Sequence, residues 1–194
     1  RDEALANCSD EERVALKEIT GEDFNPRPDF PITEPEGPGQ KWTVDTALAT
    51  VRGRKEFERG RSLFFSAKCA ACHRLRGLGG AIGPDLTSIP NKFDERYLVE
   101  AIVHPSKNIS DQYGSSRVLT ADGQILTGLV IEKDDGDLTV YPIDENAKAV
   151  EIDADEVERI EASKISQMPE GLLDRLNAEE VRDLLTYLMS AGNP

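Results

Sequence analysis

One short pattern constrains the fold of this chain more than any other: Cys-Ala-Ala-Cys-His at residues 69–73. The spacing C-x-x-C-H is typical of the attachment of a c-type haem, in which two thiols bond to the porphyrin and the histidine binds the iron. Two intervening residues let one helical turn present both sulfurs to the same edge of the macrocycle. A thioredoxin-like dithiol and half of a zinc site also contain C-x-x-C, so the rest of the chain has to distinguish them.

The motifs around this pattern occur in a recognisable order. An apolar helical stretch with Gly60 and Phe64 precedes it, Gly-Pro-Asp-Leu follows at 83–86, and Gln-Met-Pro at 167–169 leads into an amphipathic segment with Tyr187. In this order the chain resembles the class I monohaem cytochromes c over about residues 46–192. It is most similar to a planctomycete-type family of haem-binding domains, in which an extra segment interrupts the cytochrome before its methionine.

The resemblance implies roles for individual residues. It makes Cys69 and Cys72 the attachment points of haem c and His73 the proximal iron ligand. In the family the ring of that histidine donates a hydrogen bond to the carbonyl of the proline in G-P-x-L, here Pro84, although an ordinary turn proline would look the same. Leu86 completes this haem-binding motif. The resemblance also implies that Tyr187, on the closing helix, packs against Gly60 and Phe64 of the first one.

Three side chains are candidates for the sixth position on the iron. Met168 precedes a proline, which favours an extended backbone and leaves its thioether free to reach the metal. His104 ends a helical stretch before Pro105, where a histidine is usually a cap or a surface residue. Met189 lies at helical spacing in the last helix, which is typical of core methionines. We expect Met168, with His104 or an open position as the alternatives.

The hydrophobic pattern changes its period along the chain. Helical periodicity extends from Asp45 to Phe65, from Asp94 to His104 and from Asn177 onward, where Asn177 and Glu180 form a capping-box pair. Residues 112–162 instead alternate as strands separated by turns. The strands are expected at 115–120, 124–131, 138–143, 149–152 and 157–160. The sequence therefore predicts a mainly α fold with a β insertion (α+β), a helical haem domain interrupted by a small antiparallel sheet.

This pattern divides the chain into four segments. Residues 1–44 are expected to form a short helix, near 10–20, and a proline-rich linker. The first part of the cytochrome domain extends over 45–110 and the β insertion over 111–164. The methionine loop and the closing helix follow at 165–194.

Composition restricts the partners. The formal net charge is −14, which opposes binding to nucleic acid, and most of the acidic excess lies in 111–164. The charge favours a redox protein partner with a basic or mixed-charge surface, although solubility explains it equally well. No apolar run approaches the roughly 20 residues that span a bilayer.

The cysteines and the first residue indicate an exported protein. The chain begins at Arg1, and covalent haem attachment in bacteria requires export, so we expect a periplasmic protein whose signal peptide has been removed. Cys8 is the cysteine that haem does not use. An intermolecular disulfide and an incidental surface thiol explain it equally well.

Electron transfer by a covalently bound haem is the leading functional hypothesis. Such a protein is an electron carrier rather than an enzyme, because the haem does the chemistry and the chain controls its potential and exposure. The alternatives are the electron-accepting domain of a larger dehydrogenase and a haem-based gas sensor with a labile distal ligand. A zinc or dithiol site explains neither the Met-Pro nor the G-P-D-L motif.

Overall fold

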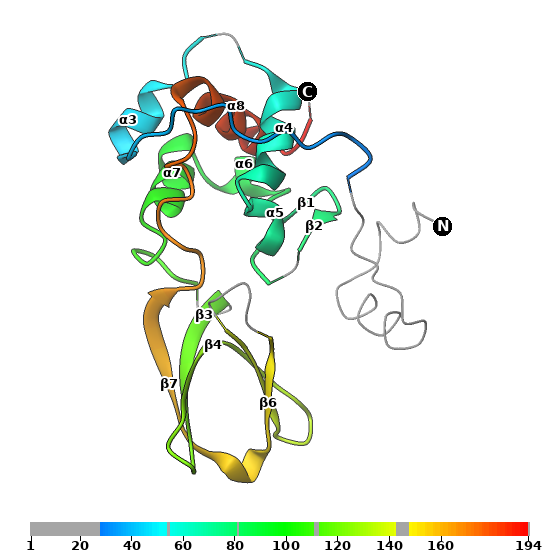
Figure 1. The fold of residues 1–194 in the computed structure, drawn as a ribbon, viewed down its shortest axis with the longest axis vertical. Coiled ribbons are helices and arrows are strands. Elements are labelled where there is room, and N and C mark those ends of the chain that lie inside the picture. Colours follow the sequence, from blue (N-terminus) through cyan, green and yellow to red (C-terminus); the bar gives the residue numbers. More distant parts are fainter. Residues whose placement is uncertain (1–27, 54, 81, 111–112, 143–147, 194) are drawn as a thin grey trace. The chain divides into compact units, whose positions relative to one another are not determined.

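The computed structural model describes residues 28–53, 55–80, 82–110, 113–142 and 148–193, and Figure 1 shows the fold. The chain forms two compact units. The helical unit comprises the described residues up to Val103 and those from Gly171 onward, and the β unit comprises His104–Glu170. The expected short helix at 10–20 and Cys8 lie outside the described residues. No helix in the described ranges is long and apolar enough to cross a membrane.

The helical unit contains the described helices and one short β-hairpin. The helices are α3 (Val44–Ala49), α4 (Phe57–Ser66), α5 (Cys69–Cys72), α6 (Ile89–Lys92), α7 (Glu95–Val103) and α8 (Ala178–Met189), and the hairpin pairs β1 (Arg74–Leu75) with β2 (Leu78–Gly79).

The crossing of α4 and α8 organises the helical unit. A Cβ at Gly60 would lie 2.1 Å from the carbonyl oxygen of Asp183, so only glycine lets the two helices approach this closely. The ring of Tyr187 packs against Phe64 with centroids 5.8 Å apart and against Phe57 at 5.2 Å. The expected packing of Tyr187 against Gly60 and Phe64 is therefore confirmed. The core of the unit is completed by buried Leu63, Leu75, Val99, Leu176, Val181, Leu184, Leu185 and Leu188.

The cap of α8 also matches the sequence pattern. The Asn177 side chain accepts hydrogen bonds from the backbone N–H groups of Glu179 and Glu180, each at 3.0 Å. The Glu180 carboxylate accepts in return from the backbone N–H of Asn177 at 2.8 Å. This reciprocal pair satisfies N–H groups that the first helical turn leaves without partners.

The β unit is a five-stranded antiparallel sheet in the order β6-β5-β4-β3-β7. The strands are β3 (Gly114–Thr120), β4 (Ile125–Glu132), β5 (Leu138–Pro142), β6 (Val150–Ile152) and β7 (Val157–Ser166), with the 3₁₀ turn η2 (Ala154–Glu156) before β7. One face carries the core of Val118, Leu138, Val140 and Ile152.

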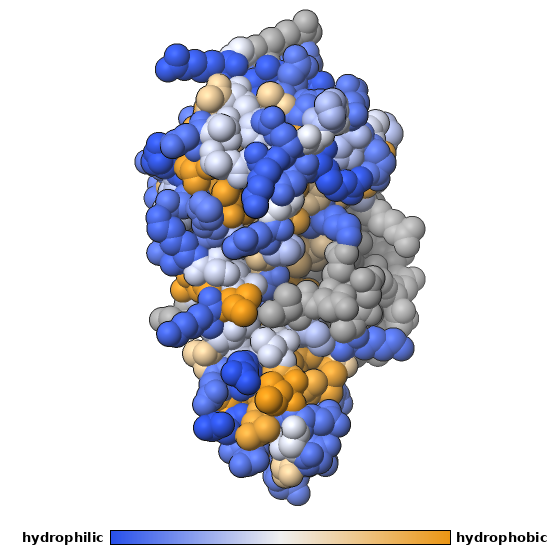
Figure 2. Space-filling model, turned by 60° about the vertical axis from the view of Figure 1, so that its left-hand side comes forward, coloured by the Kyte–Doolittle hydropathy of each residue, from blue (hydrophilic) through white to orange (hydrophobic). Residues whose placement is uncertain are grey.

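Hydrophobic side chains also lie at the surface of the β unit. Ile125 is 56% exposed, Ile131 48%, Ile160 47% and Ile165 61%. Figure 2 shows hydrophobic residues, in orange, gathered on one side of this unit. A soluble sheet normally buries such residues or breaks them up with charges, so this surface requires an explanation.

The expectation of a mainly α fold is wrong, because the described chain is a mixed fold with 31% of its residues in helices and 24% in strands. Two observations account for the difference. The helix expected from Asp45 to Phe65 is interrupted after Ala49, and Gly53, with a φ of 120°, lies in the break between α3 and α4. The five strands lie where the alternation predicts them, but β7 extends to Ser166, six residues beyond the expected end.

Candidate functional site

The C-x-x-C-H pattern folds as a single helical turn. Lys68 precedes α5 with a φ of 67°, and the backbone N–H of His73 closes the turn by donating to the carbonyl of Cys69 at 2.9 Å. His73 itself is extended, with φ −103° and ψ 143°. The turn therefore contains both Cys69 and Cys72, and His73 lies just outside the helix. This arrangement suits a macrocycle that is attached along one edge.

The imidazole of His73 is held by the loop that follows. Its Nδ1 lies 2.9 Å from the carbonyl oxygen of Pro84. A carbonyl can only accept a hydrogen bond, so in the neutral ring Nδ1 carries the hydrogen and Nε2 keeps its lone pair. Burial lowers the pKa of His73, which favours this neutral form, while the bond to Pro84 opposes the shift. A neutral ring with a free Nε2 is the form that binds a metal.

Three glycines hold the loop against the helical turn. A Cβ at Gly83 would lie 2.8 Å from Cε1 of His73, and the Gly83 N–H donates to the carbonyl of Cys72 at 2.8 Å. The N–H of Gly80 donates to Ala70, and a Cβ at Gly79 would lie 2.2 Å from the carbonyl oxygen of His73. The contact of Gly83 with the ring was missed from the sequence, although the run of glycines at 77–83 was its signal.

Leu86 lies at the end of this loop. Leu86 is 9% exposed, and its backbone N–H donates at 2.8 Å to the carbonyl of Arg74, the residue directly after His73. This bond fixes the distance between Pro84 and His73. The structure thus brings together four of the predicted site residues, Cys72, His73, Pro84 and Leu86, and Cys69 lies in the same turn.

Cys69 and Cys72 form no disulfide, and the Cys69 thiol differs from that of a reactive dithiol. The pKa of Cys69 is raised to about 12, mainly by burial and to a lesser extent by the charge of the nearby Cys72. Because the thiolate is the nucleophile, a thiol with such a pKa is a poor redox catalyst at neutral pH. Among the residues that the structure describes, no group of three or more His, Cys, Asp and Glu side chains could hold a metal ion. Neither the dithiol nor the zinc alternative gains support.

The candidates for the sixth ligand lie elsewhere in the chain. Met168 and His104 belong to the β unit, and Met189 is the last residue of α8. Met168 is half-buried, and its backbone N–H donates to the Ser166 hydroxyl at 3.1 Å. That bond restrains the Met-Pro loop at the end of β7.

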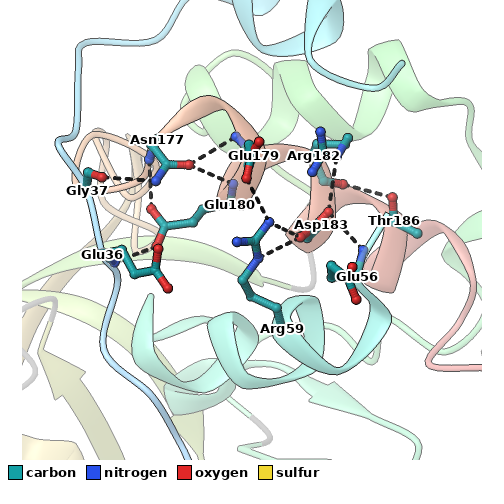
Figure 3. Close-up of polar contacts among 10 residues, drawn as sticks. All are labelled: Glu36, Gly37, Glu56, Arg59, Asn177, Glu179, Glu180, Arg182, Asp183 and Thr186. Atoms are coloured by element: carbon teal, nitrogen blue, oxygen red, sulfur yellow. Dashed lines mark hydrogen bonds and ion pairs between the residues drawn. The ribbon is translucent and has the colours of Figure 1, made fainter. Parts of the chain in front are cut away.

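A buried carboxylate joins α4, which precedes the attachment turn, to α8 (Figure 3). Asp183 is fully buried. Its Oδ2 accepts from Nε of Arg59 at 2.7 Å, and its Oδ1 accepts from Nε of Arg182 and from the backbone N–H of Glu56, each at 3.1 Å. Several donors compensate the loss of hydration that a buried charge otherwise suffers.

Residues 28–42, here called the strap, pack against the same two helices. The Glu36 N–H donates to the buried Glu180 carboxylate at 2.6 Å, and the Asn177 side chain donates to the carbonyl of Gly37 at 3.0 Å (Figure 3). Further along, the Trp42 indole donates to the carbonyl of Leu176 at 3.1 Å. The strap therefore stabilises the start of α8.

Comparison with known proteins agrees with this geometry. Residues 57–135 match the family model for cytochrome c, a segment that includes α4, the C-x-x-C-H turn, the G-P-D-L loop and α7. A search of curated proteins found no match. The family match supports a class I cytochrome c domain in this part of the chain, and with it haem-based electron transfer. The cofactor that such a domain binds is haem c, attached covalently and holding iron.

Proposed function

We propose that this protein is an electron carrier whose haem c is attached at Cys69 and Cys72 and ligated by His73 and Met168. The observation that carries the proposal is the bond from Nδ1 of His73 to Pro84, which leaves Nε2 of this ring to bind a metal directly after the helical turn of Cys69 and Cys72. Leu86 is proposed to contact the macrocycle, because it is the apolar residue of the same loop. When bound, the haem supplies one-electron chemistry by cycling its iron between the ferric and ferrous states.

The residues of the chain tune that chemistry. The Pro84 carbonyl makes the His73 imidazole a stronger electron donor and fixes its orientation. A thioether such as that of Met168 raises the reduction potential relative to a second histidine, which suits transfer to high-potential acceptors. The restraint of the Met168 backbone by Ser166 would limit how far the thioether can move away between redox states.

The finer assignments of family, compartment and partner are also proposals. The five strands β3–β7 lie between the C-x-x-C-H turn and Met168 in the sequence, which is the arrangement of the planctomycete-type family. Class I domains are typically exported, which supports the periplasm. The excess of acidic side chains supports a basic or mixed-charge redox protein as partner.

The visible absorption spectrum of the matured holoprotein tests the ligand set. The wild type should show sharp reduced c-type bands and, when oxidised, the weak long-wavelength band of a sulfur-to-ferric-iron bond. Met168→Ala should remove that band and open the iron to cyanide or carbon monoxide. Met189→Ala is the matched control and should leave the spectrum unchanged.

Other outcomes would redirect the assignment. If Met168→Ala keeps the sulfur band, the proposed sixth ligand is wrong. If the wild type lacks that band and binds carbon monoxide freely, the gas-sensor hypothesis replaces the electron carrier. If the wild type lacks the band but resists both ligands, His104→Ala becomes the decisive variant.

A further inference from the structure

The edge strand β7 has only one neighbour among the described residues. It pairs with β3 from Thr120↔Val157 to Gly114↔Ser166, and no other described strand lies on its second side. The stretch from Glu158 to Ala162 is exposed at every residue. Strands of this length with an open side present a row of backbone N–H and C=O groups that can pair with a further strand.

The apolar face of the sheet continues to this edge. Ile160 lies directly opposite Val118 and therefore points to the face that carries the core. Val118 is fully buried, whereas Ile160 is 47% exposed. The core face thus ends in an uncovered isoleucine, and one more strand beside β7 would cover it.

The side chains of β7 are complementary in charge and polarity to those of β7 in a second copy of the chain. Arg159 and Glu161 lie on the opposite face from Ile160 and pair with each other at 3.2 Å. Two antiparallel copies of β7 related by a two-fold axis at Ile160 would place each Arg159 opposite Glu161 of the other copy. In the same arrangement the two Ile160 side chains face each other, and Glu158 faces Ala162.

Pairings in which the two-fold axis is shifted by one residue lack this complementarity. An axis at Glu161 would set two carboxylates opposite each other, and an axis at Arg159 would set two guanidinium groups opposite each other. Like charges directly opposite in a sheet are destabilising, whereas opposite charges and apolar pairs are stabilising.

We propose that this protein self-associates through β7, by antiparallel pairing with β7 of a second copy about a two-fold axis at Ile160. The two five-stranded sheets then form one continuous sheet, and the two Ile160 side chains join the core faces. The contact is isologous, so it closes as a dimer and does not propagate. This proposal does not depend on the haem or its ligands.

Sedimentation velocity of the full-length holoprotein over a concentration series tests the proposal. The buffer should be near physiological ionic strength, where a screening length of about 8 Å weakens repulsion between two acidic chains. The average mass should rise from monomer to dimer with concentration. Amide hydrogen exchange in residues 157–162 should slow over the same range, because an added strand protects the outer groups of β7.

Charge reversal identifies the register. Arg159→Glu should weaken the dimer about tenfold or more, because both opposite-charge pairs become like-charge pairs. Glu161→Arg should do the same, and the two substitutions together should restore association. Ile160→Asp should also weaken the dimer. Ile131→Asp is the matched control, since Ile131 is equally exposed at 48% but lies on β4 away from the edge.

Two results would overturn the proposal. One is a monomeric mass at every soluble concentration, which is also the result expected if a strand from an unrelated protein occupies β7. The other is a dimer that Arg159→Glu and Ile160→Asp leave unchanged, which would place the interface elsewhere. Circular dichroism of each variant verifies that the β unit is folded, and restoration by the double substitution excludes a simple loss of stability.

Discussion

Removal of the buried Asp183 carboxylate, which pairs with Arg59, should strongly destabilise the helical unit. The Asp183 carboxylate is fully buried and accepts from Arg59, Arg182 and the Glu56 backbone. Asp183→Ala leaves these donors without their acceptor. Removal of one partner from a buried ion pair costs about 3–5 kcal/mol.

Two corrections bring the expected loss to the lower limit of that range or below it. The Arg59 side chain is 26% exposed, so water can hydrate part of its guanidinium after the substitution. Alanine also has a better helix propensity than aspartate by about 0.5 kcal/mol. We therefore expect Asp183→Ala to lower the free energy of unfolding by about 2–3 kcal/mol. For a chain of this size that corresponds to a fall in Tm of about 5–10 °C.

Arg59 provides its own control because it contacts a second carboxylate. Glu179 lies 3.4 Å from the Arg59 guanidinium and is 67% exposed, so Glu179→Ala should cost less than about 1 kcal/mol. Thermal unfolding followed by far-ultraviolet circular dichroism compares the two variants. Equal losses in the two variants, or a Tm for Asp183→Ala within about 2 °C of the wild type, would refute the argument that burial makes the difference.

Two further variants or conditions test the site and its partner. Gly83→Ala places a methyl group 2.8 Å from Cε1 of His73, so it should displace the ring and convert part of the low-spin haem spectrum to high-spin; an unchanged spectrum would show that the loop can move aside. If the acidic excess of the chain steers a basic redox partner, the rate of electron transfer to that partner should fall steeply with salt, whereas a flat response would leave solubility as the explanation of the charge.

The sequence predicted what local patterns determine. The C-x-x-C-H turn and the Asn177 capping box each depend on residues within one or two helical turns, and both form as expected. The alternation in 112–162 likewise located five strands. These elements could be predicted because the side chains that form each pattern lie close together in the chain.

What the sequence did not predict depends on partners far away in the chain. Glu36 and Glu180 are 144 residues apart, and Trp42 and Leu176 are 134 apart, so the sequence predicted a proline-rich linker without showing what it packs against. The break of the helix before α4 was missed because Gly53 lies within an otherwise helical pattern. The extension of β7 to Ser166 was missed because its exposed charges interrupt the alternation.

The two proposed iron ligands also differ in how far along the sequence their supporting contacts lie. His73 and its acceptor Pro84 are 11 residues apart, and hydrogen bonds from Gly80, Gly83 and Leu86 close the loop between them. Met168 follows His73 by 95 residues that include all five strands of the β unit. Loop-closure entropy rises with separation, and a distant ligand also depends on the folding of everything between. Attachment of haem at the C-x-x-C-H turn therefore requires only local order, whereas occupation of the sixth position by Met168 requires a folded β unit.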